Sequence, residues 1–256
     1  MESNVNTIVS ASRDLSRRLA ELRFSEPVEY VYNPLEYARA AWEQYITRYG
    51  SGRKRVIFLG MNPGPWGMVQ NGIPFGERDA VGEWLRIDAP ITSPDSTHPK
   101  RPVLGYNSTR SEVSGRRFWG LMRSRFERPE VFFESHFVAN YCPLAFLERS
   151  GRNRTPDKLP AAEARALFAA CDALLAEIVA VMRPDWLIGV GAFATQRART
   201  AVAAAETTLN AGEIPATRVA TVLHPSPASP RANAGWEQAA VKQLVDLGVW
   251  SDGSTA

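Results

Sequence analysis

Four side chains have the chemistry of a hydrolytic site for a flat, polar ligand. Asn62 can accept a hydrogen bond from a water molecule and donate another, which suits the positioning of an attacking water. His224 can donate a hydrogen bond to negative charge that develops during bond cleavage. Asn140 offers one acceptor and two donors, so it can pair with the edge of a pyrimidine, and Phe75 can stack on such a base.

Each of these residues also has an ordinary structural explanation. Asn62 would suit a left-handed turn position, and His224 would suit a turn with a local backbone bond. Asn140 would simply end a strand, and Phe75 would belong to the core. A common location in the fold is what would make them a site.

The candidate residues lie in or beside two loops that are rich in glycine and proline. The first loop, Gly60–Glu77, reads GMNPGPWGMVQNGIPFGE, and the second runs over His224–Trp236. Glycines let backbone N–H groups approach a flat ligand, and prolines hold a loop in one shape, so a preorganised pocket is expected. A rigid but inert connector is the alternative for the first loop. A phosphate loop is excluded, because the first loop has neither a Walker A Lys-Ser/Thr pair nor a GxGxxG sequence.

Short apolar runs between helical patterns predict an α/β fold with a mostly parallel sheet. A continuous apolar run such as Val56–Leu59 is typical of a strand that is buried on both faces. Strands that alternate with helices imply a three-layer α/β/α domain. The predicted strands are Val56–Leu59, Phe137–Ala139, Trp186–Val190 and Val219–Leu223. The predicted helices are 8–23, 35–49, 116–126 with Ser114 as its N-cap, 160–182, 192–205 and 234–247.

The predicted topology also indicates where a site would form. In open parallel sheets, ligands bind outside the carboxyl ends of the strands. Both loops start at such ends, after Leu59 and Leu223, and a third strand end delivers Asn140 to the same edge. We expect the candidate residues to meet there. The Pro/Gly-rich stretches 60–76, 89–105 and 224–235 are expected to contain neither helix nor strand.

The composition is that of an ordinary soluble globular protein. With 256 residues, 45% hydrophobic and 22% charged, the chain is expected to form one domain over residues 1–256, with helices from residues 1–50 packed on it. No stretch approaches the roughly 18 apolar residues that span a bilayer, and the N-terminus lacks the pattern of a secretory signal. We expect an intracellular protein, cytoplasmic in a bacterium or nuclear in a eukaryote, without membrane contact.

The cysteines and histidines leave little scope for a metal centre. Cys142 and Cys171 lie in apolar settings, without a CxxC pair or a Cys/His cluster. The chain has three histidines in all. We expect both cysteines to be core residues, and neither a metal ion nor a cofactor.

A basic stretch is the clearest feature of the charge distribution, since the net charge is only +3. A solvated helix face is its ordinary explanation, and a surface that faces phosphates is the alternative. The stretch contains Lys100, Arg101, Arg110, Arg116, Arg117, Arg123, Arg125 and Arg128, opposed by Glu112 and Glu127.

Five sequence blocks resemble the single-strand-selective monofunctional uracil-DNA glycosylases. They are the first loop, HPKRPVLG from His98, SEVSGRRFWG from Ser111, FVANYCPL from Phe137 and HPSPASPRANAGW from His224. The resemblance implies the uracil-DNA glycosylase fold, an α/β/α sandwich around a four-stranded parallel sheet. It also implies hydrolysis of the N-glycosidic bond of uracil in DNA.

The resemblance implies roles for the four candidate residues. Asn62 matches the family's water-positioning Asn, and His224 matches the His that stabilises the departing base. Asn140 matches the Asn that reads the uracil edge, and Phe75 matches the aromatic residue stacked on the base. The first and second loops would then form one base pocket.

Further positions match the pocket wall and a DNA-contacting wedge. Met61, Gly64 and Met68 match positions where backbone groups and a bound water probe the C5 substituent. The stretch Pro225–Arg231 matches a helical wedge that enters the duplex where the nucleotide leaves. Its candidate DNA contacts are Ser226, Pro227, Ala228, Ser229 and Arg231.

The chain departs from the family pattern at two places. Ala228 stands where the wedge usually carries an Arg, and Arg231 would have to substitute for it. Trp66 replaces the more familiar Phe in the first loop. The first departure bears on base flipping from duplex DNA.

The implied substrates are uracil and 5-oxidised uracils, such as 5-hydroxymethyluracil, in single- and double-stranded DNA. The matched motifs offer no lysine nucleophile, so base release that leaves an abasic site without strand cleavage is expected. We also expect a monomer. Three alternatives stay open. They are a glycosylase of the same fold acting on hypoxanthine or xanthine, a catalytically silent binder of damaged DNA, and a nucleotide-binding α/β protein unrelated to DNA.

Overall fold

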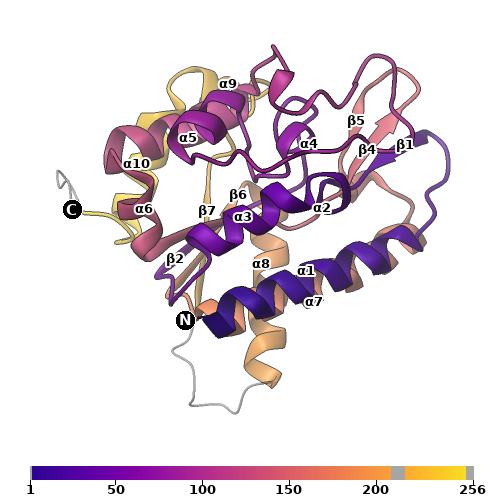
Figure 1. Ribbon diagram of the computed structural model, residues 1–256. Coiled ribbons are helices and arrows are strands. Elements are labelled where there is room, and N and C mark those ends of the chain that lie inside the picture. The colour runs from indigo at the N-terminus through magenta and orange to yellow at the C-terminus, as the bar shows by residue number, and fades with distance from the viewer. Residues whose placement is uncertain (1, 209–216, 252–256) are drawn as a thin grey trace.

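The computed structural model describes residues 2–208 and 217–251, and its centre is a four-stranded parallel sheet (Figure 1). The strand order is β3-β2-β6-β7, and every neighbouring pair is parallel. The bounds are β2 (Val56–Gly60), β3 (His136–Asn140), β6 (Trp186–Val190) and β7 (Arg218–Val222). The predicted fold class is therefore confirmed, and each predicted strand lies within one residue of the observed one at either end.

Helices cover both faces of this sheet. Phe58 pairs with Ile188 in register, so both point to one face and the next residue of β6, Gly189, points to the other. On the first face, Phe118 of α5 (Val113–Phe126) contacts Phe58 with ring centroids 5.6 Å apart. On the second face lies α8 (Ala192–Thr208). A Cβ on Gly189 would lie 2.3 Å from the backbone N of Thr195, so α8 can approach only because residue 189 is glycine.

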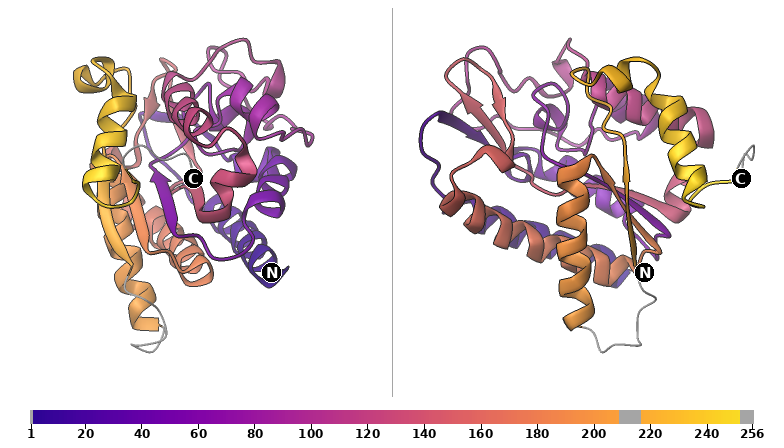
Figure 2. Two further views of the ribbon diagram at one scale, coloured as in Figure 1. Left: turned by 90° about the vertical axis from the view of Figure 1, so that its left-hand side faces the viewer. Right: turned by 180° about the vertical axis from the view of Figure 1, so that it is seen from behind.

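Two long helices form an outer layer away from the glycine- and proline-rich loops. Figure 1 shows these loops at the top, while α1 (Glu2–Ala20) and α7 (Ala161–Met182) run side by side at the bottom. Figure 2 shows the same pairing from behind, with α8 crossing α7. Beside them, α3 (Arg39–Tyr49) protects the sheet edge, because the hydroxyl of Tyr45 donates to the carbonyl of Val138 on edge strand β3 at 2.9 Å.

A second, antiparallel sheet was not predicted from the sequence. It consists of β1 (Val28–Tyr32), β4 (Ala145–Glu148) and β5 (Asn153–Arg154), in the order β1-β4-β5. These strands are short and the pairing of β1 with β4 is irregular, so they leave no clear two-residue period. The sheet matters for the first loop, because Asn153 donates to the carbonyl of Pro63 at 2.9 Å.

The prediction that the Pro/Gly-rich stretches contain no helix was wrong at two places. The helical turn α4 (Met68–Asn71) lies in the first loop and ends at Gly72, whose φ of 78° suits glycine. The turn α9 (Pro230–Asn233) lies in the second loop. There Ser229 is the N-cap, and its side chain accepts from the N–H of Ala232.

The predicted cap of α5 was also wrong. The helix begins at Val113, so Ser114 lies inside its first turn and Glu112 holds the N-cap position. The Glu112 side chain does not cap its own helix, because it accepts from the N–H of Trp66 at 3.2 Å instead. As predicted, Cys142 and Cys171 are buried and form no disulfide.

The remaining elements are short except for α10 (Trp236–Asp246), which packs beside α5. Within residues 2–208 and 217–251, no helix combines the length and the apolar character that crossing a membrane requires. The short helices are α2 (Pro34–Tyr37), the π-helix η1 (Ala80–Trp84), the 3-10 helices η2 (Gly105–Asn107) and η3 (Pro156–Lys158), and α6 (Pro129–Ser135).

Candidate functional site

Gly60 is the point at which two of the candidate side chains meet. It ends β2 and pairs in register with Asn140, which ends β3. A Cβ on Gly60 would lie 2.1 Å from Oδ1 of Asn140 and 2.8 Å from Cε2 of Phe75. Only glycine therefore leaves room for the carboxamide and the phenyl ring at this position. The expectation that these residues meet at the carboxyl edge of the sheet is met by this geometry.

Phe75 is held in an unusual backbone conformation. Its φ is 54°, which is uncommon for a residue with a bulky side chain. Its ring stacks on Phe118 with centroids 4.5 Å apart and planes at 12°. The indole of Trp119 donates to the carbonyl of the preceding residue, Pro74, at 3.1 Å. Because Phe118 covers one face of the Phe75 ring, a base can stack only on the other face.

Asn140 contacts a second candidate residue, Met68. The Nδ2 group of Asn140 donates to Sδ of Met68 at 3.1 Å. A thioether is a weak acceptor, so a carbonyl oxygen of a ligand would be a better partner for this N–H. The structure thus brings Asn140, Met68 and Phe75 together around Gly60.

Asn62 lies on the backbone that extends the β2–β3 pairing. The carbonyl of Met61 accepts from the N–H of Cys142 at 2.9 Å, which continues the ladder past the strand ends. The Nδ2 group of Asn62 donates to the carbonyl of Leu144 at 3.3 Å. This bond orients the carboxamide and leaves Oδ1 as an acceptor for a water molecule.

Two backbone N–H groups at the pocket positions have no acceptor among the described residues. The carbonyl of Gly64 accepts from the N–H groups of Gly67 and Val69, both at 3.2 Å. The N–H of Gly64 and the N–H of Met68, which is the first residue of α4, make no such bond within residues 2–208 and 217–251. Both can therefore donate to a ligand or a water.

His224 lies at the start of the second loop, with its ring centroid 6.4 Å from that of Phe75. Two hydrogen bonds fix the preceding residue, Leu223. Its carbonyl accepts from the indole N–H of Trp236 at 2.7 Å, and the backbone N–H of Leu223 donates to Oε1 of Gln243 at 2.9 Å. Burial lowers the pKa of His224. The imidazole is therefore neutral at pH 7, with one N–H donor and one acceptor nitrogen.

Helix α5 contacts both loops, which the sequence alone does not indicate. Phe118 and Trp119 support the first loop, as described above, and Gly115 lets the helix come close to it. A Cβ on Gly115 would lie 2.2 Å from the carbonyl oxygen of Phe75. Arg117 reaches the second loop, where it donates to the carbonyl of Pro225 at 3.1 Å and to Oδ1 of Asn233 at 2.9 Å.

Glu112 places a carboxyl group against the 61–76 part of the first loop, which has no carboxyl group of its own. A Cβ on Gly64 would lie 2.5 Å from Oε2 of Glu112, and one on Gly67 would lie 3.1 Å from its Cγ, so the side chain lies directly on the loop. Burial raises the pKa of this carboxyl, while the bond from the N–H of Trp66 lowers it. Proximity to the pocket was not visible in the sequence, although SEVSG belongs to one of the five blocks.

The wedge stretch is not the helix that was expected. Residues 225–229 form a turn, and helix begins only at Pro230. Polar bonds fix the turn instead, since Ser226 accepts from the N–H of Ala228 at 3.2 Å and Asn233 donates to the carbonyl of Pro227 at 2.9 Å. Pro227, Ala228 and Arg231 are exposed, whereas Ser226 and Ser229 are half-buried.

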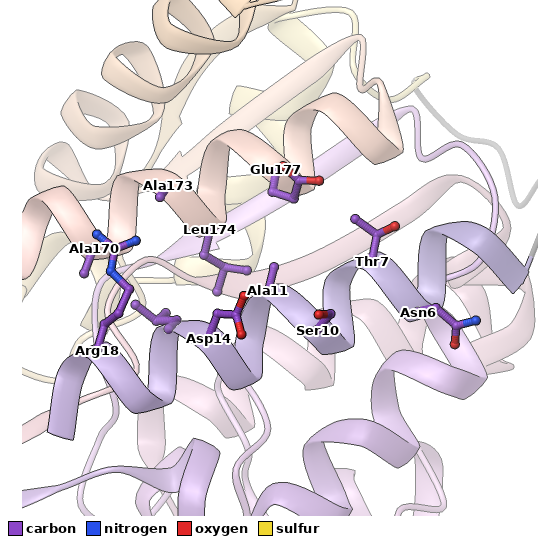
Figure 3. Close-up of a pocket in the computed structure, with 11 residues that line it drawn as sticks. Asn6, Thr7, Ser10, Ala11, Asp14, Arg18, Ala170, Ala173, Leu174 and Glu177 are labelled. Atoms are coloured by element: carbon purple, nitrogen blue, oxygen red, sulfur yellow. The ribbon is translucent and has the colours of Figure 1, made fainter.

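A groove of about 590 Å³ lies elsewhere, between α1 and α7 (Figure 3). Short side chains such as Ser10, Ala11 and Ala173 line it, together with Asp14 and Arg18. None of the candidate site residues contributes to this groove. Among the described residues, no group of three or more His, Cys, Asp or Glu side chains is arranged to hold a metal ion.

Known proteins with related sequences and structures identify the family to which the chain belongs. Residues 47–245 match the family model of the uracil DNA glycosylase superfamily. The single-strand selective monofunctional uracil-DNA glycosylase of Rattus norvegicus is 49% identical over 235 residues, which cover 92% of this chain and 82% of that protein. The corresponding protein of Mus musculus is 48% identical over 92% of this chain and 81% of its own length. The crystal structure of wild-type SMUG2 of Pedobacter heparinus superposes with a TM-score of 0.67 at 16% identity, covering 96% of this chain and 97% of that one.

Proposed function

The chain belongs to the uracil DNA glycosylase superfamily, and we propose that it is a monofunctional glycosylase of DNA repair that releases uracil and leaves an abasic site. The observation that carries the proposal is the meeting of Phe75, Asn140 and Met68 over Gly60, with His224 beside Phe75. This group offers a stacking face, a base-reading amide and a donor for a leaving group at one edge of the sheet.

In the proposed complex, the base stacks on the free face of Phe75 and pairs with Asn140. Oδ1 of Asn140 accepts from N3–H of uracil, and Nδ2 donates to O4. Met68 contacts Nδ2, so it lies on the O4 side of the base, next to C5. Binding would replace the weak N–H···S contact with a bond to a carbonyl oxygen.

The C5 position is proposed to admit 5-hydroxymethyluracil and other 5-oxidised uracils while it refuses thymine. The unpaired N–H groups of Gly64 and Met68 can hold a water near C5. The hydroxyl of 5-hydroxymethyluracil can replace this water and its bonds, whereas the methyl of thymine would displace the water without replacing them. A methyl group alone is discriminated by only about 1–3 kcal/mol, so the lost water bonds supply the rest.

Cleavage is proposed to proceed by departure of the base and attack of water. The C1′–N1 bond breaks with its electron pair on the base, and the N–H of neutral His224 donates to O2 of the uracil anion. Oδ1 of Asn62 orients a water, whose oxygen bonds to C1′ and whose proton passes to solvent. No lysine lies among the candidate site residues, so no covalent intermediate or strand cleavage follows.

Activity is proposed for single-stranded DNA and, with lower efficiency, for duplex DNA. Flipping a base from a duplex costs a few kcal/mol, which a single-stranded substrate avoids. In this chain the wedge presents Ala228 at its tip, and the nearest cation on it is Arg231. The wedge residues Ser226, Pro227, Ala228, Ser229 and Arg231 are proposed to contact DNA. The monomeric state and the intracellular location remain predictions.

The test is release of free base from oligonucleotides that each contain one uracil, 5-hydroxymethyluracil, thymine, xanthine or hypoxanthine, in single- and double-stranded form. Uracil and 5-hydroxymethyluracil should be released, and His224→Ala should lower the single-turnover rate by about 10²–10³. Asn140→Asp should weaken uracil release, because a carboxylate cannot donate to O4. Preferential release of xanthine or hypoxanthine would instead establish the purine alternative, and binding without release would establish a silent binder.

A further inference from the structure

Trp66, one of the two residues that depart from the family pattern, has two guanidinium groups over its ring. Cζ of Arg110 lies 4.5 Å from the ring centroid, and Cζ of Arg101 lies 5.2 Å from it. Both distances fall within the roughly 6 Å range of cation–π attraction. One half-buried aromatic side chain thus holds two positive charges at the surface.

Neither charge is neutralised within the described part of the chain. Arg101 donates to the carbonyls of Gly151 at 2.9 Å and Lys100 at 3.1 Å, which are neutral acceptors, so its positive charge is uncompensated. Arg110 is exposed, and its guanidinium group makes no hydrogen bond or ion pair with residues 2–208 and 217–251; its backbone carbonyl accepts from the hydroxyl of Ser108 at 3.5 Å. Its N–H groups and the Nη2 group of Arg101 are therefore available to an anion.

The carboxyl group of Glu112 makes no ion pair with these cations among the described residues. Glu112 lies two positions after Arg110, but its carboxyl is directed at the first loop and accepts from the N–H of Trp66. Burial also raises the pKa of Glu112, which disfavours its charged form. The two guanidinium groups on Trp66 are therefore not paired with Glu112.

Trp66, Arg101 and Arg110, here called the Trp66 cluster, are linked through Glu112 to the proposed pocket position Gly64. Trp66 is bonded through its N–H to Glu112, and Glu112 touches Gly64, whose N–H is proposed to face the C5 position. The wedge lies on the second loop, which follows β7, two strands away from β2 in the sheet. Trp66 and the wedge therefore belong to two different loops that both follow strands of the central sheet.

We propose that Trp66, Arg101 and Arg110 form a phosphate clamp that holds the backbone of single-stranded DNA beside the base pocket. The proposal rests on the proposed function and names the surface by which that site grips its substrate. Guanidinium groups pair with phosphate through directed, charge-assisted bonds, and the indole ring holds both groups in position before DNA arrives. The clamp supplies positively charged groups on the first-loop side of the pocket. The wedge on the second loop has the uncharged Ala228 where the family usually has an Arg.

The experiment measures binding of a single-stranded oligonucleotide containing 2′-fluoro-2′-deoxyuridine, whose glycosidic bond resists hydrolysis, at several salt concentrations. Arg110→Ala should weaken binding about fivefold or more, as expected for loss of a charge-assisted bond. The slope of log K against log salt should also fall by about 0.7, the value for one phosphate contact on a single strand. Trp66→Leu should weaken binding and keep the slope, because both cations remain, whereas Trp66→Phe should restore most of the affinity.

Arg18→Ala is the matched control. Arg18 lies on α1, on the far side of the molecule from the loops (Figures 1 and 3), so its removal changes net charge equally without touching the clamp. Equal effects of Arg18→Ala and Arg110→Ala, or an unchanged salt slope in Arg110→Ala, would overturn the clamp. The exposed guanidinium group of Arg110 makes no hydrogen bond or ion pair with the described residues, and Arg110→Ala keeps the backbone carbonyl that accepts from Ser108, so the substitution is not expected to unfold the protein. Uracil release by the unsubstituted protein is measured separately. If this protein binds DNA through the clamp but releases no uracil, the proposed function is refuted and the clamp is not.

Discussion

Arg117 connects α5 to the loop that begins at His224, and its removal should impair catalysis without removing any group that touches the base. The change Arg117→Ala deletes the bonds to Pro225 and Asn233. Asn233 in turn donates to the carbonyl of Pro227, so both ends of the turn lose support. Because Pro225 directly follows His224, the expected consequence is a less constrained imidazole.

The size of the effect follows from these two bonds. A hydrogen bond to a charged group contributes about 1.5–3 kcal/mol when it is buried. Arg117 is half-buried and Asn233 is exposed, so solvent screening reduces the sum to about 1–2 kcal/mol. If that free energy is lost from the position of the His224 loop, the single-turnover rate of uracil release should fall roughly 5- to 30-fold.

The assay compares Arg117→Ala with Arg116→Ala on a single-stranded uracil substrate. Arg116 lies on the same helix and carries the same charge, but the only hydrogen bond of its side chain among the described residues is to the hydroxyl of Ser111 at 3.3 Å. Arg116→Ala should stay near the original rate. Arg117→Lys should recover part of the loss, because one of the two bonds can be remade. Thermal melting checks that both alanine variants are folded. Equal rates of uracil release for two folded variants would refute the proposed role of Arg117.

Two further predictions concern buried groups. Burial lowers the pKa of His136 to about 3, and its Nε2 accepts from the indole of Trp250 at 3.1 Å. In the unfolded chain His136 takes up a proton near pH 6.5, so the free energy of unfolding should fall by about 1.4 kcal/mol for each pH unit between about 6.5 and 3. Denaturant unfolding measured at several pH values should show a smaller pH dependence of this free energy in His136→Gln. An equal pH dependence in the two proteins would contradict the prediction. Gly60→Ala would place a Cβ within 2.1 Å of Asn140 and 2.8 Å of Phe75, so the uracil-release rate should fall by about 10² or more while the protein stays folded; nearly unchanged single-turnover release would show that the pocket adapts.

The sequence could predict the parallel sheet because its strands are buried on both faces. Runs such as Val56–Leu59 are continuous and apolar, and this pattern needs no knowledge of their neighbours. The antiparallel strands β1, β4 and β5 escaped prediction because each is short and β1 is only partly buried. Their pairing depends on contacts between segments far apart in the chain.

The site divides in the same way. Asn62, Phe75, Asn140 and His224 could be proposed from strand ends and glycine-rich loops, which are local features. The role of Arg117 could not, because its partner Asn233 lies 116 positions away and a basic helix face has a simpler explanation. The Glu112 carboxyl on Gly64 and the guanidinium groups on Trp66 are likewise contacts that only the folded chain creates.

The base pocket is assembled before DNA binds, and this restricts where selectivity can arise. Phe75 is fixed at a φ of 54° between Phe118 and the close backbone of Gly115, and α5 also holds the second loop through Arg117. Because one helix supports both loops, they cannot move apart without breaking contacts on α5. Discrimination between bases then belongs to the pocket, whereas discrimination between single strands and duplexes belongs to the rims. If the wedge and the Trp66 cluster contact DNA as proposed, a polar turn with the exposed Ala228 and two guanidinium groups on Trp66 would favour a strand that arrives already unpaired over one that must be opened.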